Sequence, residues 1–115
     1  MNIEKVPTIF ANIYVGLKEH YSQVVFDYDV AYSICQEYVN EVGLCVTFTK
    51  TEYIYTEGNE VGLIIGLINY PRFPSDYETI YNHAMELGKR LKKQLNQHRV
   101  SIMMNDFTYI LDDNE

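Results

Sequence analysis

Tryptophan is absent from this sequence, and proline, cysteine and basic residues are scarce. Nine Lys and Arg stand against sixteen Asp and Glu, so the formal net charge is −7. Nucleic-acid backbones and anionic membrane surfaces require clustered Lys and Arg, so neither is an expected partner. The longest apolar run, residues 61–68, is too short to span a membrane, and the amino terminus lacks the features of a secretion signal. We therefore expect a cytoplasmic protein.

The two cysteines also limit the possible chemistry. Cys35 falls in a helical pattern and Cys45 in a strand pattern, and no Cys/His cluster has the spacing of metal ligands. This favours two buried free thiols over a disulfide, with no metal and no cofactor.

The hydrophobic periodicity gives the order strand, helix, strand, strand, helix, strand. Strands are expected at residues 9–17, 44–55, 61–70 and 100–105, and helices between 27 and 43 and from 75 onward. The apolar run from Phe107 to Leu111 either extends the last strand or folds back as a short fifth one. The pattern predicts one α+β domain over residues 1–115. This would be a ferredoxin-like βαββαβ sandwich, with a four-stranded antiparallel sheet and two helices on one face.

Local signals place the ends of these elements. Asp27 or Asp29 is suited to cap the first helix, and Gly43 to end it. Glu57-Gly58-Asn59 marks a turn between the second and third strands. Ser75 and Glu78 have the spacing of a capping box at the start of the second helix.

If both helices cover one sheet face, the other face is too apolar to be fully solvated. Alternation assigns to it Asn12, Tyr14, Gly16, Thr47, Thr49, Gly62, Ile64, Gly66, Ile68, Ser101 and Met103. Apolar patches of this size usually mark association. We therefore expect a homo-oligomer that packs through this helix-free face and through the hairpin.

The junction from Asn69 to Pro74 is the first candidate site. Two prolines fix its backbone, and Arg72 lies between the aromatic Tyr70 and Phe73, just before a helix. A guanidinium beside free helix N–H groups suits phosphate or carboxylate, and the aromatic rings suit stacking. A rigid turn with a solvated Arg72 is the competing interpretation, and the sequence leaves both open.

The hairpin arm from Lys50 to Glu60 is the second candidate. It carries Tyr53 and Tyr55 and is longer than a four-stranded sheet needs. It would contact a ligand or a neighbouring subunit, or it would be a solvated tip. His20 lies beside a carboxylate and a phenol, but it has no evident nucleophile or metal partner.

The segment Gly43-Leu44-Cys45-Val46-Thr47 and the hairpin with Tyr53-Ile54-Tyr55, in the βαββαβ order, resemble the PII and divalent-cation-tolerance (CutA-like) group of small trimeric proteins. That resemblance implies a non-enzymatic protein with ligand clefts between subunits. No nucleotide-contacting motif of the group is matched, so no residue role is carried over. The small, acidic, Tyr-rich chain also resembles accessory phage proteins, some of which sequester nucleotide immune signals.

These observations favour a non-enzymatic, homo-oligomeric protein that binds or sequesters a small anionic ligand, most plausibly a nucleotide signal, in the manner of an anti-defence sponge. The expected ligand-binding residues are Asn69, Tyr70, Arg72, Phe73, Lys50, Tyr53 and Tyr55. The alternative is an acidic protein-interaction module or an inhibitor of a host protein. An enzyme that uses His20 ranks third.

Overall fold

The computed structural model describes residues 1–20, 22–70 and 74–113. Its seven elements follow the chain as β1 (Phe10–Gly16), α1 (Tyr28–Val42), β2 (Thr47–Tyr55), β3 (Gly58–Ile68), α2 (Tyr77–Gln94), β4 (Arg99–Met104) and β5 (Thr108–Asp112). No helix in these ranges is long and apolar enough to cross a membrane.

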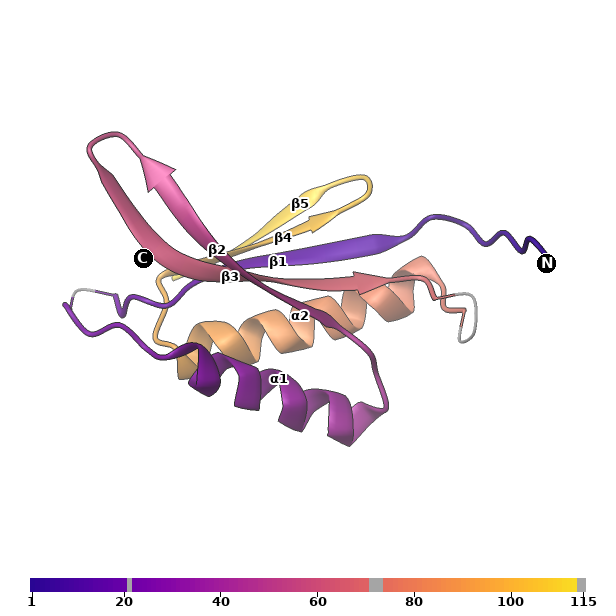
Figure 1. Cartoon of the computed structure of the whole chain (residues 1–115), viewed down its shortest axis with the longest axis horizontal. Coiled ribbons are helices and arrows are strands. Elements are labelled where there is room, and N and C mark those ends of the chain that lie inside the picture. The colour runs from indigo at the N-terminus through magenta and orange to yellow at the C-terminus, as the bar shows by residue number, and fades with distance from the viewer. Residues whose placement is uncertain (21, 71–73, 114–115) are drawn as a thin grey trace.

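The five strands form one antiparallel sheet in the order β2-β3-β1-β4-β5, with both helices against one of its faces (Figure 1). The prediction of an α+β chain with two helices and an antiparallel sheet is confirmed. The prediction of four strands is wrong, because residues 108–112 fold back and pair with β4. The ferredoxin-like name stays a prediction.

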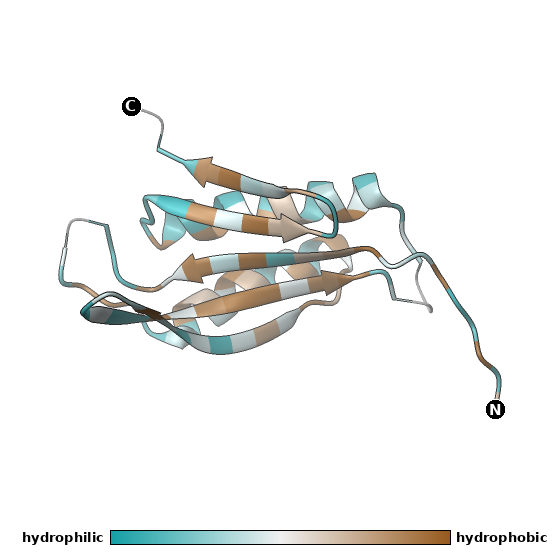
Figure 2. Ribbon diagram, turned by 90° about the horizontal axis from the view of Figure 1, so that it is seen from above, coloured by the Kyte–Doolittle hydropathy of each residue, from teal (hydrophilic) through white to brown (hydrophobic). Residues whose placement is uncertain are grey.

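Strand alternation builds the core on the helix-covered face. Ala11, Ile13 and Val15 of β1 are buried there, and Leu63 and Ile65 of β3 lie beside them. Helix α2 contributes a buried stripe at helical spacing, which comprises Ile80, Ala84, Leu87 and Leu91. Figure 2 shows the sheet from its other side, with the helices behind it and hydropathy alternating along the strands.

Cross-strand register confirms which residues share the helix-free face. Asn12 pairs with Gly66 on one side and with Met103 on the other, and Tyr14 pairs with Ile64 and Ser101. Directly opposed residues point to the same side of an antiparallel sheet. The residues that alternation assigned to this face therefore lie together, with the β5 side chains at its edge.

Two element ends differ from the sequence prediction. The N-cap of α2 is Asp76, whose carboxylate accepts the Thr79 N–H at 2.8 Å. Ser75 lies one residue before this cap, and its N–H, which a capping box would give to Glu78, donates to the Asn69 side chain instead. In the hairpin, Tyr55 pairs directly with Gly58, so only Thr56 and Glu57 form the turn.

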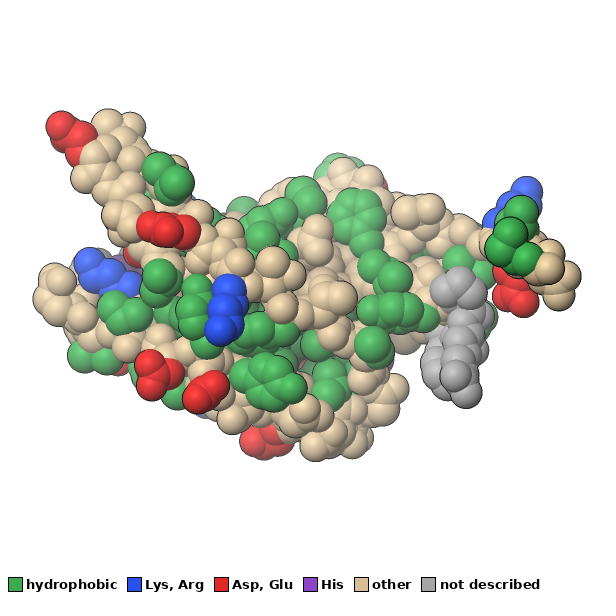
Figure 3. Space-filling model, viewed as in Figure 1, with side chains coloured by type: hydrophobic (Ala, Val, Ile, Leu, Met, Phe, Trp, Pro, Cys, Tyr) green, Lys and Arg blue, Asp and Glu red, His purple; other side chains and the backbone are tan. Residues whose placement is uncertain are grey.

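The β2–β3 hairpin extends beyond the helices as an arm (Figure 1), and the space-filling view shows it standing clear of the body (Figure 3). Ile54 near its tip is 82% exposed. The Cα radius of gyration is 15.0 Å. A compact chain of this length has about 13 Å. Part of the chain thus projects away from the core.

Gly43 ends α1 as predicted, in a left-handed conformation with φ of 72°. Nothing lies within 4 Å of a Cβ placed there, so Gly43→Ala tests backbone strain alone. We expect it to lower the free energy of unfolding by about 1 kcal/mol and the melting temperature by about 4 °C. Thermal unfolding followed by circular dichroism measures both. Glu37→Ala, on the exposed surface of the same helix, is the control, and equal melting of the two variants would contradict the strain argument.

Candidate functional site

Two glycines form a strip without side chains across the helix-free face. Gly16 at the end of β1 lies directly opposite Gly62 of β3. On the β2 side, Gly62 pairs with Thr51. On the other side, the β1–β4 register continues from Tyr14 and Ser101 towards Gly16 and the first residue of β4, Arg99. The strip is therefore bordered by β2 and by the start of β4.

Two oxygen acceptors pack over Gly16. The Oε1 atoms of Glu60 and Gln97 each lie 3.0 Å from the position that a Cβ on Gly16 would occupy. Gln97 is only 9% exposed. Its Nε2 donates to the carbonyls of Lys18 at 2.8 Å and Leu95 at 3.0 Å, which fixes the amide with its oxygen packed over Gly16. A side chain at Gly16 would collide with these two acceptors, so the glycine lets both of them lie against the sheet.

Glu60 and Gln97 line a cleft of about 570 Å³. Its walls come from the loop after β1 (residues 18–20 and 22–23), from Glu60 on β3, and from Gln97, His98 and Arg99 where α2 leads into β4. Small-molecule sites occupy about 300–1,000 Å³. The cleft is therefore large enough for a metabolite, and it carries charges of both signs.

Tyr53 covers the Gly62 half of the strip. Its ring covers Gly62, where a Cβ would collide with it. The hydroxyl donates to the carbonyls of Leu63 at 3.0 Å and Val15 at 3.2 Å. Burial raises the pKa of Tyr53 to about 12. The phenol is thus a neutral wall that holds the base of the hairpin against the sheet.

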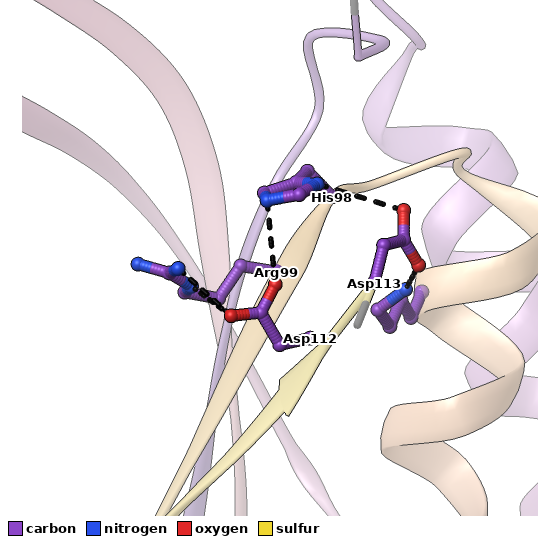
Figure 4. A network of polar contacts seen from close by, with 5 residues as sticks. His98, Arg99, Asp112 and Asp113 are labelled. Atoms are coloured by element: carbon purple, nitrogen blue, oxygen red, sulfur yellow. Dashed lines mark hydrogen bonds and ion pairs between the residues drawn. The ribbon is translucent and has the colours of Figure 1, made fainter. Parts of the chain in front are cut away.

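A chain of ionic contacts supports the opposite side of the cleft, which His98 and Arg99 line (Figure 4). It runs from Arg99 to Asp112, His98, Asp113 and Lys92. Asp112 accepts from Arg99 at 2.8 Å and lies 3.3 Å from His98 Nε2, while His98 Nδ1 lies 3.6 Å from Asp113. The Lys92 ammonium lowers the pKa of Asp113. The end of β5 is thereby tied to the start of β4 and the end of α2.

His20, which the sequence placed in third rank, lines the same cleft. Its ring stacks on His98 with centroids 4.6 Å apart and planes 20° from parallel. Across the described part of the chain, no three His, Cys, Asp or Glu side chains are grouped so that they could hold a metal ion.

The two predicted site regions lie at opposite ends of β3. Tyr53 pairs with Glu60 near the start of this strand, whereas Asn69 follows its last residue. Nine residues of extended chain span about 30 Å. Within one chain, the hairpin therefore does not close over Asn69 and Tyr70. A pocket that combines both regions stays a prediction, and it requires two subunits.

The individual hairpin residues make local contacts. Lys50 lies over the Tyr28 ring at 4.9 Å from its centroid. The ring of Tyr55 packs over Gly58 and is itself 55% exposed.

Asn69 is a buried structural residue at the other end. Its Nδ2 donates to the Pro7 carbonyl at 2.9 Å, and its Oδ1 accepts the Ser75 N–H at 2.7 Å. The side chain thus joins the segment before β1 to the start of α2. The predicted ligand residues Arg72 and Phe73 lie outside the described residues.

Tyr70 borders a separate cleft of about 410 Å³, together with Cys45 and His83. Burial and a hydrogen bond with Cys45 raise the pKa of Tyr70. Cys45 is exposed, so the expectation of two buried thiols holds only for Cys35, whose pKa burial raises to about 12. Cys45 departs from the pattern because it precedes the strand, which begins only at Thr47.

Sequence reasoning missed the residues of the cleft. Glu60, Gln97 and Arg99 come from separate segments and have no motif in common, and Asp112, which binds Arg99, belongs to yet another strand. The available signal was Gly16 and Gly62 on one predicted face, since glycines on a strand face invite close approach by a ligand. Register alone shows which charged residues lie beside them.

Comparison with protein-family models and with curated proteins found no match. Among solved structures, the chain is similar to a phage SAM lyase in complex with S-methyl-5′-thioadenosine. The TM-score is 0.76 at 19% identity, over 97% of this chain and 96% of that one. It is also similar to a phage SAM lyase in the apo state, with a TM-score of 0.72 at 17% identity, over 100% and 98%. The similarity establishes a shared fold.

These findings overturn two expectations. A non-enzymatic protein that sequesters a nucleotide signal was expected, with a protein-interaction module as the alternative. Both similar structures are of an enzyme, so the non-enzyme assignment is wrong and neither function is retained. The resemblance to the PII and CutA-like group gains no support from these comparisons.

Asn69→Ala separates a structural role from a ligand-binding one. The substitution leaves the Pro7 carbonyl and the Ser75 N–H without their partner. We expect a loss of about 2 kcal/mol in the free energy of unfolding, measured by urea denaturation. Asn59→Ala, on the exposed hairpin, is the matched control and should change stability little. A variant as stable as the control would contradict the structural role.

Proposed function

We propose that this protein is an enzyme that cleaves S-adenosylmethionine (SAM) and releases S-methyl-5′-thioadenosine. Its support is the combination of a fold shared over nearly the whole chain with a phage SAM lyase and a charged cleft of metabolite size. The observation that carries the proposal is the pair of acceptors in this cleft, where Glu60 and Gln97 both place an Oε1 atom over Gly16.

The Glu60 carboxylate and the Gln97 amide oxygen suit the sulfonium end of this substrate. SAM carries a positive charge on sulfur, and a carboxylate attracts it most strongly where water is partly excluded. No side chain within the described ranges donates a hydrogen bond to the Glu60 carboxylate, so this group is available to a cation. The fixed Gln97 oxygen adds a second acceptor without any reorganisation on binding.

The chemistry needs no metal and no protein nucleophile. The sulfonium is already a leaving group, so the bond between Cγ and sulfur breaks with its electron pair moving to sulfur. A carboxylate oxygen of the same SAM molecule forms the new bond to Cγ and closes a five-membered lactone. The products are neutral S-methyl-5′-thioadenosine and an amino lactone, and no proton is gained or lost. The cleft contributes by binding the reacting ends close together.

The proposal includes a phage origin and action in the host cytoplasm. Both similar structures are phage proteins. The chain is also small, acidic and rich in Tyr, the features by which it resembles accessory phage proteins. A phage accessory protein of this kind would deplete SAM in the infected cell.

The proposal also includes self-association through the helix-free face. Ile68 and Ile110 on that face are 49% and 51% exposed. Ile68 lies at the end of β3 away from the charged cleft, and Ile110 lies two residues before Asp112 on β5. The projecting hairpin offers further apolar surface at Ile54 and Tyr55. A second copy that covers these groups would remove them from water.

The activity test incubates the protein with SAM and follows S-methyl-5′-thioadenosine by chromatography and mass spectrometry. Glu60→Gln should lower kcat/KM about 100-fold, because the amide keeps the shape but loses the charge. Glu52→Gln, on the opposite face of the same hairpin, should leave the rate unchanged. Wild-type protein that releases no S-methyl-5′-thioadenosine would refute the activity, and a fully active Glu60→Gln would refute the role of Glu60.

The association test measures mass by light scattering after size exclusion. One chain has a mass of 13.5 kDa, and we expect a whole multiple of it for the wild type. Ile110→Glu should shift the protein towards the single-chain mass, because it places a charge on the helix-free face. Val30→Glu, on the exposed side of α1, is the control. A wild-type mass of one chain at micromolar concentration would count against self-association.

A further inference from the structure

We infer that Arg99, held in orientation by Asp112, receives the carboxylate of the substrate's amino-acid end. This inference rests on the proposed cleavage of SAM. It adds a specificity-determining residue, Arg99, and a positioning residue, Asp112, to the Glu60 carboxylate already described.

The first argument is placement. Glu60 belongs to β3 and Arg99 to β4, and these two strands flank β1. Neighbouring strands lie about 4.8 Å apart, so the two backbones are separated by about 10 Å. Gly16 lies in this interval and contributes no side chain. A carboxylate and a guanidinium therefore face the same cleft from opposite sides, with room for a ligand between them.

The second argument is orientation. Arg99 uses Nε at 3.2 Å and Nη2 at 2.8 Å to bind one oxygen of Asp112, Oδ2. The other oxygen, Oδ1, lies 3.3 Å from His98 Nε2, so Asp112 is held from two sides. Figure 4 shows the guanidinium and His98 at different oxygens of Asp112. Because the Arg99 guanidinium is planar and rigid, the contact of one edge with Asp112 also fixes the direction of the opposite edge.

The third argument is the chemistry of the open edge. Nη1 of Arg99 has no partner within the described residues, and the side chain is 58% exposed. A guanidinium edge matches a carboxylate in geometry and charge. In SAM the carboxylate is separated from the sulfonium by three carbons, so the two charges can reach Arg99 and Glu60 together. S-methyl-5′-thioadenosine lacks the amino-acid end, so its binding should not depend on Arg99.

The competing explanation is that Arg99 and Asp112 are a surface ion pair that only joins β4 to β5. Exposed pairs of this kind add little stability. A purely structural role also predicts that substitution affects every ligand alike. Ligand discrimination therefore separates the two explanations.

The test measures dissociation constants by calorimetry for two uncleavable probes, S-adenosylhomocysteine and S-methyl-5′-thioadenosine. Both contain the adenosine and a neutral sulfur, and only the first carries the amino-acid end. Arg99→Gln should weaken S-adenosylhomocysteine binding about 10- to 100-fold and leave S-methyl-5′-thioadenosine binding within about twofold. Arg99→Lys should recover part of the loss, because it keeps the positive charge but lacks the two parallel N–H donors of a guanidinium edge. Asp112→Asn should cause a smaller loss for the same probe and raise KM for SAM more than it lowers kcat.

Arg90→Gln is the matched control, since Arg90 pairs with Glu41 and Glu86 outside the cleft. Equal effects of Arg99→Gln on both probes, or no effect on either, would overturn the inference. Arg99-dependent binding of S-adenosylhomocysteine by a protein that cleaves no SAM would keep this subsite and refute the proposed activity. Wild-type protein that binds neither probe would refute both.

Discussion

The antiparallel register that seats β1 between β3 and β4 is the constraint on which the rest of the structure depends. It aligns Gly16 with Gly62 and so leaves a bare strip across the helix-free face. In the same register the side chains of Ala11, Ile13 and Val15 point into the core between the sheet and the helices. Burial of those side chains fixes the pairing, and the pairing in turn determines which charged groups stand beside the strip. Stability and site geometry therefore have one cause.

Much of the fold was predictable because its signals are local. Alternation in β1 and helical spacing in α2 each arise within a few residues, and both elements form where expected. The competition at the start of α2 is different, since Ser75 and Asp76 both suit an N-cap. In the structure Asp76 accepts the Thr79 N–H, whereas Ser75 donates its own N–H to the distant Asn69 side chain. The fate of residues 108–112 likewise depended on pairing with β4, which no local pattern determines.

The site was much less accessible to sequence reasoning, because its parts meet only through tertiary contacts. Glu60 and Arg99 belong to strands that do not touch each other, and Gln97 enters from a helix end. Arg72 and the tyrosines are conspicuous as residue types, whereas the polar residues of the cleft look ordinary in the sequence. What distinguishes Glu60 and Gln97 is the absence of a side chain at Gly16, which lets both oxygen atoms pack over the same point of the sheet.

The two-residue turn of the β2–β3 hairpin limits how the length of this hairpin can vary among related chains. Tyr53 and Glu60 share a face because side chains alternate along each strand. Lengthening the hairpin by one residue on one side of the turn would send one of these two to the opposite face. Adding one residue to each strand would keep them facing each other. Viable hairpins should therefore differ in length by even numbers of residues, so the length of the arm can vary among related chains only in paired steps.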